Sequence, residues 1–174
     1  MGRAKARRVT KTRQLTAGEI ALCRTIFGDS IDYPQVRLHR RRCWPLQPRG
    51  VVMAPNGGIY FHPKSPRWSE DFAAEPLDRQ GLLVHEMTHV WQVQKKGRFY
   101  LILMRHPFCR YRYELVEGRA FERYGIEQQA EIVRHVFLMR RGMRLQELAL
   151  LEELERVLPR QWTGISAQGE KRAS

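Results

Sequence analysis

The sequence predicts a single, mainly helical α+β domain with a small β-hairpin placed before its longest helix. Two observations favour this class. Apolar residues recur at helical spacing over residues 17–27, 78–95 and 126–140. Two strand-like runs within residues 50–62 are separated by turn residues. The 174 residues, 43% of them hydrophobic, are enough to bury one sizeable core.

The first 14 residues predict a disordered basic tail. They contain no acid, in a chain whose formal net charge is +13, and their cations are Arg3, Lys5, Arg7, Arg8, Lys11 and Arg13. Such a tail either keeps the chain soluble or contacts a polyanion. It has no aromatic residue for base stacking. We therefore place the folded domain at residues 15–158, followed by a flexible tail at 159–174.

A helix is expected over residues 17–27. Thr16 can cap it, Glu19 at the third helical position completes a capping box, and Gly28 can end it. Residues 36–44 alternate weakly, which indicates a strand. This strand carries outward a second basic run, made of Arg37, His39, Arg40, Arg41 and Arg42.

Residues 50–62 contain the hairpin signal. Val51–Met53 and Ile59–Phe61 are rich in residues that favour strands, and Pro55–Gly58 supplies the turn. Residues 63–77, rich in Pro and Ser, predict a loop before the next helix.

The helix expected over residues 78–95 contains the most informative motif of the chain, His85-Glu86-Met87-Thr88-His89. Residues four apart on a helix lie on one face, with Cβ atoms about 5–6 Å apart. Both imidazoles can therefore reach one zinc ion, and Glu86 can reach a water held by the metal. In the other interpretation, His85 and His89 are ordinary core residues whose hydrogen bonds are satisfied.

A catalytic zinc site needs a third protein ligand. The metzincin extension is absent, because Gln92 and Lys95 stand where its glycine and last histidine would be. The helix expected over residues 126–140 offers Glu127 and Glu131, four apart beside an apolar stripe. The pair suits a metal ligand and a partner that orients a liganding histidine. Alternatively, Glu127 is a favourable acid near a helix N-terminus and Glu131 a solvated surface residue.

The remaining segments predict supporting structure. Residues 99–104 indicate a short helix or buried segment, residues 111–115 an extended one, and residues 144–158 a last packing helix. No apolar run is long enough to span a membrane, and no signal peptide is visible. The cysteines lack metal-site or disulfide spacing, which favours a reducing compartment such as the cytoplasm; they are Cys23, Cys43 and Cys109.

Several segments resemble a known family. His85–Gln92, followed by Glu127–Val133, resembles the bacterial zinc metallopeptidases known as Vgr-related proteins. These are relatives of a peptidase-like core domain found beside contractile-injection and type VI secretion genes. Leu15–Ile20 and Phe27–Tyr33 are similar to the opening of that family, so the similarity spans roughly residues 15–142.

The resemblance implies a zincin-like fold of the gluzincin kind. By this likeness His85, His89 and Glu127 hold one zinc ion, and Glu131 supports a histidine. The more usual gluzincin acid at that last position is aspartate, which is one methylene shorter. The likeness also implies that Ile59–His62 lines the cleft and offers a free edge to an extended substrate. An ordinary structural hairpin is the alternative.

The predicted function is zinc-dependent cleavage of a peptide or peptidoglycan-like substrate, with Glu86 as general base. Candidate donors to the tetrahedral intermediate are Tyr60, His62, Tyr113, Tyr124 and His135. Export by a specialised secretion system needs no signal peptide, and the basic N-terminus can contact that apparatus. Two other functions stay open: a zinc-containing binding or scaffold module without turnover, and a nucleic-acid-associated protein.

Overall fold

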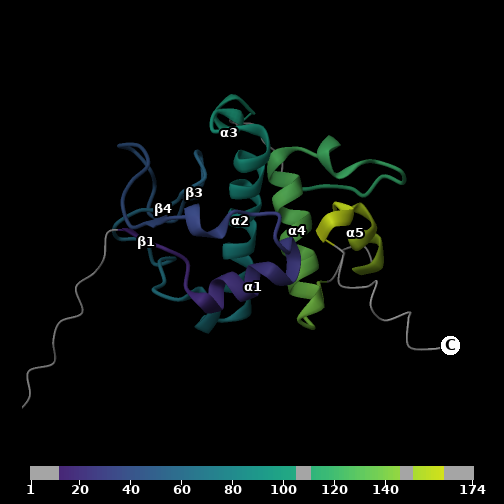
Figure 1. Cartoon of the computed structure of the whole chain (residues 1–174), viewed down its shortest axis with the longest axis horizontal. Coiled ribbons are helices and arrows are strands. Elements are labelled where there is room, and N and C mark those ends of the chain that lie inside the picture. The colour runs from purple at the N-terminus through teal and green to yellow at the C-terminus, as the bar shows by residue number, and fades with distance from the viewer. Residues whose placement is uncertain (1–11, 105–110, 146–150, 163–174) are drawn as a thin grey trace, which may run out of the picture.

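Five α-helices and a four-stranded sheet make up the part of the chain that the structure describes. The structure is a computed structural model, and its described residues are 12–104, 111–145 and 151–162. The helices are α1 (Ala17–Phe27), α2 (Leu77–Lys96), α3 (Tyr100–Met104), α4 (Ile126–Arg140) and α5 (Leu151–Val157). Helices α2 and α4 lie side by side at the centre, with the sheet on one side (Figure 1). The predicted α+β class is confirmed.

The sheet precedes α2 in the sequence and has short strands. They are β1 (Thr12–Arg13), β2 (Leu38–His39), β3 (Val52–Met53) and β4 (Ile59–Phe61). Their order is β1-β2-β4-β3, with β2 and β4 parallel and the other two pairs antiparallel. The predicted hairpin is therefore confirmed as the pair β3 and β4.

The expectation that Ile59–His62 has a free edge is wrong. Strand β4 lies between β2 and β3, so both of its edges are paired. The residues of β4 are apolar and buried on both faces, as an interior strand requires. Among the described strands, β3 stands at the edge of the sheet on the hairpin side.

Close packing of α2 and α4 positions the predicted site. Helix α2 begins at Leu77 and its last turn is followed by Gly97, whose φ of 99° suits glycine. Gly81 lies where α2 meets α4, and a Cβ added there would come within 3.0 Å of the side chain of Leu138. Glycine at this position therefore allows the two helices to approach closely.

Helix α1 starts with the predicted capping box between Thr16 and Glu19. The side chain of Glu19 is fully buried, and its carboxylate also accepts two hydrogen bonds from the Arg13 guanidinium, at 2.8 and 2.7 Å. The backbone N–H of Phe72 donates a further bond to the same carboxylate. This buried ion pair ties β1 and α1 to the segment before α2.

The folded region extends further than predicted at both ends. Residues 12–13 form β1, and Arg160–Trp162 form a 3-10 helix whose Trp162 packs edge-on against Phe27 and Trp91. Both extensions depend on partners distant in sequence, which local composition does not reveal. The remainder of the two predicted tails, residues 1–11 and 163–174, lies outside the described residues.

The other predicted segments are found in part. The short helix near residues 99–104 is α3, and residues 111–116 form no regular element. The last helix begins at Leu151 rather than at residue 144, with residues 146–150 outside the described part. Other 3-10 helices are Tyr33–Gln35, Phe72–Ala74 and Phe121–Arg123. Among the described helices, none is long and apolar enough to cross a membrane.

One hydrophobic core joins the sheet to the helices. Its largest fully buried side chains include Phe27 of α1, Phe61 of β4, Met87 of α2 and Phe137 of α4. The apolar stripe of α2 faces this core, so the neighbouring face of the same helix, which carries His85 and His89, is directed toward α4.

Candidate metal centre

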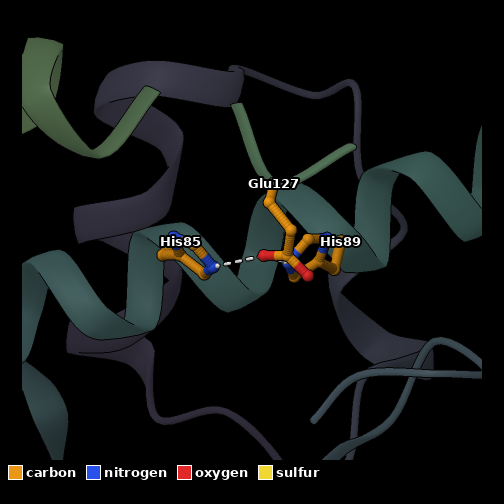
Figure 2. Close-up of side chains that lie close together, drawn as sticks. All are labelled: His85, His89 and Glu127. Atoms are coloured by element: carbon orange, nitrogen blue, oxygen red, sulfur yellow. Dashed lines mark hydrogen bonds and ion pairs between the residues drawn. The ribbon is translucent and has the colours of Figure 1, made fainter. Parts of the chain in front are cut away.

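Two helices bring the three predicted metal ligands together (Figure 2). His85 and His89 project from α2, and Glu127 projects from the first turn of α4. Oε2 of Glu127 lies 3.4 Å from Nε2 of His85 and 3.2 Å from Nε2 of His89. All three side chains are buried, and one ligand atom of each lies within 4.8 Å of the others. This group can hold a metal ion.

Charge balance inside the cluster depends on protons when no metal is bound. Burial tends to lower the pKa of His85, but hydrogen bonds to Glu127 and Glu131 and the charge of Glu86 raise it to about 9. Burial tends to raise the pKa of Glu127, yet its hydrogen bonds with His85 and His89 hold it well below the usual range. His85 therefore carries a proton at neutral pH that a metal ion must displace.

Metal affinity is expected to rise with pH, by about tenfold per pH unit up to about pH 9, because His85 must lose this proton. In the metal-free protein the same raised pKa stabilises the fold. That stabilisation is complete below the unfolded pKa of 6.5 and is lost as pH rises through about 9. Competition with a zinc chelator between about pH 6.5 and 8 measures the slope. Glu131→Gln removes a charge that raises the pKa and should flatten the slope; an unchanged slope would contradict this account.

Glu131 lies beside His85 on the side away from Glu127. Its Oε1 is 2.8 Å from Nδ1 of His85, so the extra methylene does not prevent contact. Glu131 also contacts Nε2 of His135 at 3.3 Å and the Arg134 guanidinium at 3.4 Å. In turn, Nδ1 of His135 is 2.7 Å from the hydroxyl of Tyr113. The carboxylate is thus held in place from three sides, and its supporting role stays a prediction.

Gln92 contacts the other histidine, and sequence reasoning missed it. Oε1 of Gln92 lies 2.8 Å from Nδ1 of His89. The side-chain amide of Gln92 donates to the carbonyl of Ile126 at 3.0 Å and to Oε1 of Gln129 at 2.9 Å. Gln129 itself donates to the carbonyl of Tyr124 at 2.7 Å. The sequence did contain one indication of this contact. Gln92 is three residues after His89, and residues three apart on a helix lie on the same face.

These bonds determine which nitrogen of His89 carries a proton. A backbone carbonyl only accepts hydrogen bonds, so the two carbonyls orient the amides of Gln129 and Gln92. Oε1 of Gln92 must then face His89 and accept a proton from Nδ1. This leaves Nε2 as the ring nitrogen that can bind a metal ion, 3.2 Å from Oε2 of Glu127. The donor set of two imidazoles and one carboxylate fits a zinc ion.

Three of the five predicted transition-state donors have partners outside the cluster. The Asn56 amide donates to Oη of Tyr60, the Val116 N–H to Oη of Tyr124, and the Lys64 N–H to Nδ1 of His62. Tyr113 and His135 are hydrogen-bonded to each other and reach His85 through Glu131. The role of all five residues as donors stays a prediction.

Tyr111 is a further residue at the site that sequence reasoning missed. Its ring stacks against the ring of His85, with centroids 6.4 Å apart and planes at 19°, and it is 51% exposed. In an extended segment, residues i and i+2 lie on the same side. Because Tyr113 was a candidate donor at the site, Tyr111 could have been considered as well.

Comparison with known proteins identifies a related domain. No family model matches the chain. Among solved structures, the effector domain of Pseudomonas aeruginosa VgrG2b is similar to it, with a TM-score of 0.65, 42% sequence identity and 75% of each chain covered. The chain belongs to the VgrG2b effector-domain family. It is also 46% identical over 133 residues to the P. aeruginosa type VI secretion system spike protein VgrG2b.

The chain corresponds to a small part of the spike protein. The matched region covers 72% of this chain but 13% of VgrG2b. Membership in the VgrG2b effector-domain family confirms the relationship to type VI secretion proteins that the sequence resemblance implied. Family membership does not define the reaction of this chain, which is inferred below from the metal cluster.

In this member of the VgrG2b effector-domain family, replacing Gln92 by leucine is expected to weaken zinc binding by about 10–100-fold. Leucine has a similar size but cannot accept the Nδ1 proton, so His89 loses its preferred tautomer and ring orientation. Zinc affinity by chelator competition measures the loss. Gln94→Leu is the matched control, because Gln94 is on the same helix as His89 but bonds to the backbone of Asp32. Equal affinity in both variants would contradict the role of Gln92.

Proposed function

We propose that the chain is a zinc-dependent metallopeptidase. The buried cluster of His85, His89 and Glu127, in a chain of the VgrG2b effector-domain family, is the observation that carries the proposal. These three side chains hold the ion, and Glu131 supports His85. When bound, zinc lowers the pKa of a water from 15.7 to about 7 and polarises a substrate carbonyl.

Glu86 is the proposed general base. It follows His85 on α2, is buried, and lies close enough to add to the raised pKa of that histidine. A carboxylate at this position accepts the proton of the attacking water and returns it to the leaving amine. For the developing oxyanion we propose a donor among Tyr111, Tyr113 and His135, which lie on the His85 side of the cluster.

The relationship to a secretion spike suggests how the enzyme reaches its target. VgrG2b is a type VI secretion system spike protein. We propose that the chain is delivered by an apparatus of that kind, and that its basic N-terminal residues contact the apparatus or a polyanion. The substrate is a peptide or a peptidoglycan-like cross-link.

A cleavage screen on the zinc-loaded chain tests the function. Peptides and peptidoglycan fragments are incubated with the chain, with the chain plus chelator, and with the chelated chain restored by zinc. We expect cleavage that the chelator stops and zinc restores. Stoichiometric zinc without any cleavage would instead support a binding or scaffold module. Absence of bound metal, with salt-dependent DNA binding that needs residues 1–13, would support the nucleic-acid alternative.

A further inference from the structure

A small cavity of about 230 Å³ lies beside the metal cluster. His89 and Glu127 form one wall of it. The rest of its lining is apolar and comes from the edge strand β3 and its turn, from α3 and from the start of α4; these residues are Met53, Ala54, Pro55, Leu101, Ile102 and Ile126. The cavity therefore adjoins the proposed reaction centre directly.

The size and lining of the cavity define what it can hold. Sites that enclose a whole small molecule measure about 300–1,000 Å³, so this one admits a part of a larger molecule. Among the described residues, its walls outside the metal cluster offer no charged or hydrogen-bonding side chain. A charged or strongly polar group placed there would lose its hydration without compensation. An apolar side chain, in contrast, exchanges water for apolar walls.

The surface around the cavity indicates a chain-like occupant. Ile102 lines the cavity yet is 58% exposed, and apolar residues on α3 and just before it are exposed as well. These residues are Phe99, Leu103 and Met104, which are 61%, 82% and 48% exposed. Another part of the lining comes from β3, the edge strand of the described sheet, and an extended polypeptide can pair with such an edge. The two features together fit a polypeptide segment with alternating side chains.

We propose that this cavity receives a large apolar side chain of an extended polypeptide substrate, next to the bond that is cleaved. The proposal rests on the peptidase function above and narrows its substrate class. It favours polypeptide segments with leucine, isoleucine, methionine or phenylalanine beside the scissile bond over segments with small or charged residues there. Ile102 is the proposed specificity-determining residue at the mouth of the cavity.

Binding of model peptides to the zinc-loaded Glu86→Gln variant tests the cavity without turnover. Fluorescent hexapeptides that differ only in one central residue, Leu, Phe, Ala, Lys or Asp, are compared by anisotropy. We expect the Leu and Phe peptides to bind at least about tenfold more tightly than the Asp and Lys peptides. Adding Ile102→Asp should remove that preference. Adding Leu46→Asp, at an exposed apolar position that does not line the cavity, should leave it intact.

The outcomes separate this inference from the function on which it rests. Equal binding of all peptides, or equal loss in the Ile102 and Leu46 variants at equal zinc content, overturns the cavity assignment. The wild-type chain is assayed for cleavage of the same peptides. Apolar preference in binding without any cleavage would refute the peptidase and support the cavity as a peptide-binding site. Cleavage without apolar preference would refute the cavity and support the peptidase.

Discussion

Replacing Glu86 by glutamine is expected to abolish hydrolysis while the chain keeps its metal. The amide has nearly the shape of the carboxylate, and the three metal ligands are other residues, so the fold and the metal affinity are preserved. Only the capacity to accept a proton is lost. A positioned general base contributes about 10²–10⁴-fold to a rate, so turnover should fall by at least about 100-fold. Rate measurements on any substrate found in the screen, together with elemental analysis of zinc, test this.

Glu152→Gln is a matched control for that experiment. It makes the same chemical change on α5, where the side chain is 82% exposed and contacts Arg156. We expect it to leave both rate and zinc content unchanged. Full activity in the Glu86 variant would contradict its role as general base. Loss of zinc in that variant would show instead that Glu86 takes part in holding the metal.

Features coded by neighbouring residues were predictable from the sequence. The capping box of Thr16 and Glu19 needs only residues three apart, and the apolar stripe of α2 needs only helical periodicity. The same spacing argument put Glu127 and Glu131 on one face of a second helix. Periodicity alone does not say which helices pack together. The expectation that the histidine face of α2 meets the glutamate face of α4 came from the need for a third metal ligand and from the family resemblance.

Features that depend on distant partners were not predictable. Strand β4 is interior because Leu38 of β2 pairs with Ile59 in parallel, and no local pattern encodes that pairing. Gln92 was noticed only as the residue that excludes a metzincin. Its contact with His89 acquires meaning through Gln129 and two backbone carbonyls, which lie 32 or more residues further along the chain. A side chain that orients a ligand is thus harder to foresee than the ligand itself.

Replacing His89 by alanine is expected to remove the metal. The variant lacks one of three ligand atoms, and it leaves the carboxylate of Glu127 and the amide of Gln92 without the ring that joins them. The loss of zinc affinity should exceed the about 10–100-fold that removal of a supporting partner costs. At zinc concentrations about 1,000-fold above its dissociation constant, the wild type gains about 4 kcal/mol of stability. For a chain of this size, that gain raises Tm by roughly 8–16 °C. The variant should show little of this shift.

His39→Ala is the control for the His89 variant. It distinguishes the effect of losing a metal ligand from the effect of losing a histidine elsewhere in the protein. His39 lies on β2, where its ring stacks on Tyr60, outside the cluster that can hold a metal. We expect it to keep the full zinc-dependent rise in Tm, whatever its effect on the metal-free protein. The difference between zinc-loaded and metal-free Tm is therefore the decisive quantity, because damage to packing changes both values together. A full rise in the His89 variant, with one zinc per chain, would mean that His89 is an ordinary core histidine. The proposed hydrolysis would then lack one of its three metal ligands, and the role of Glu86 as general base at this centre would lose its support.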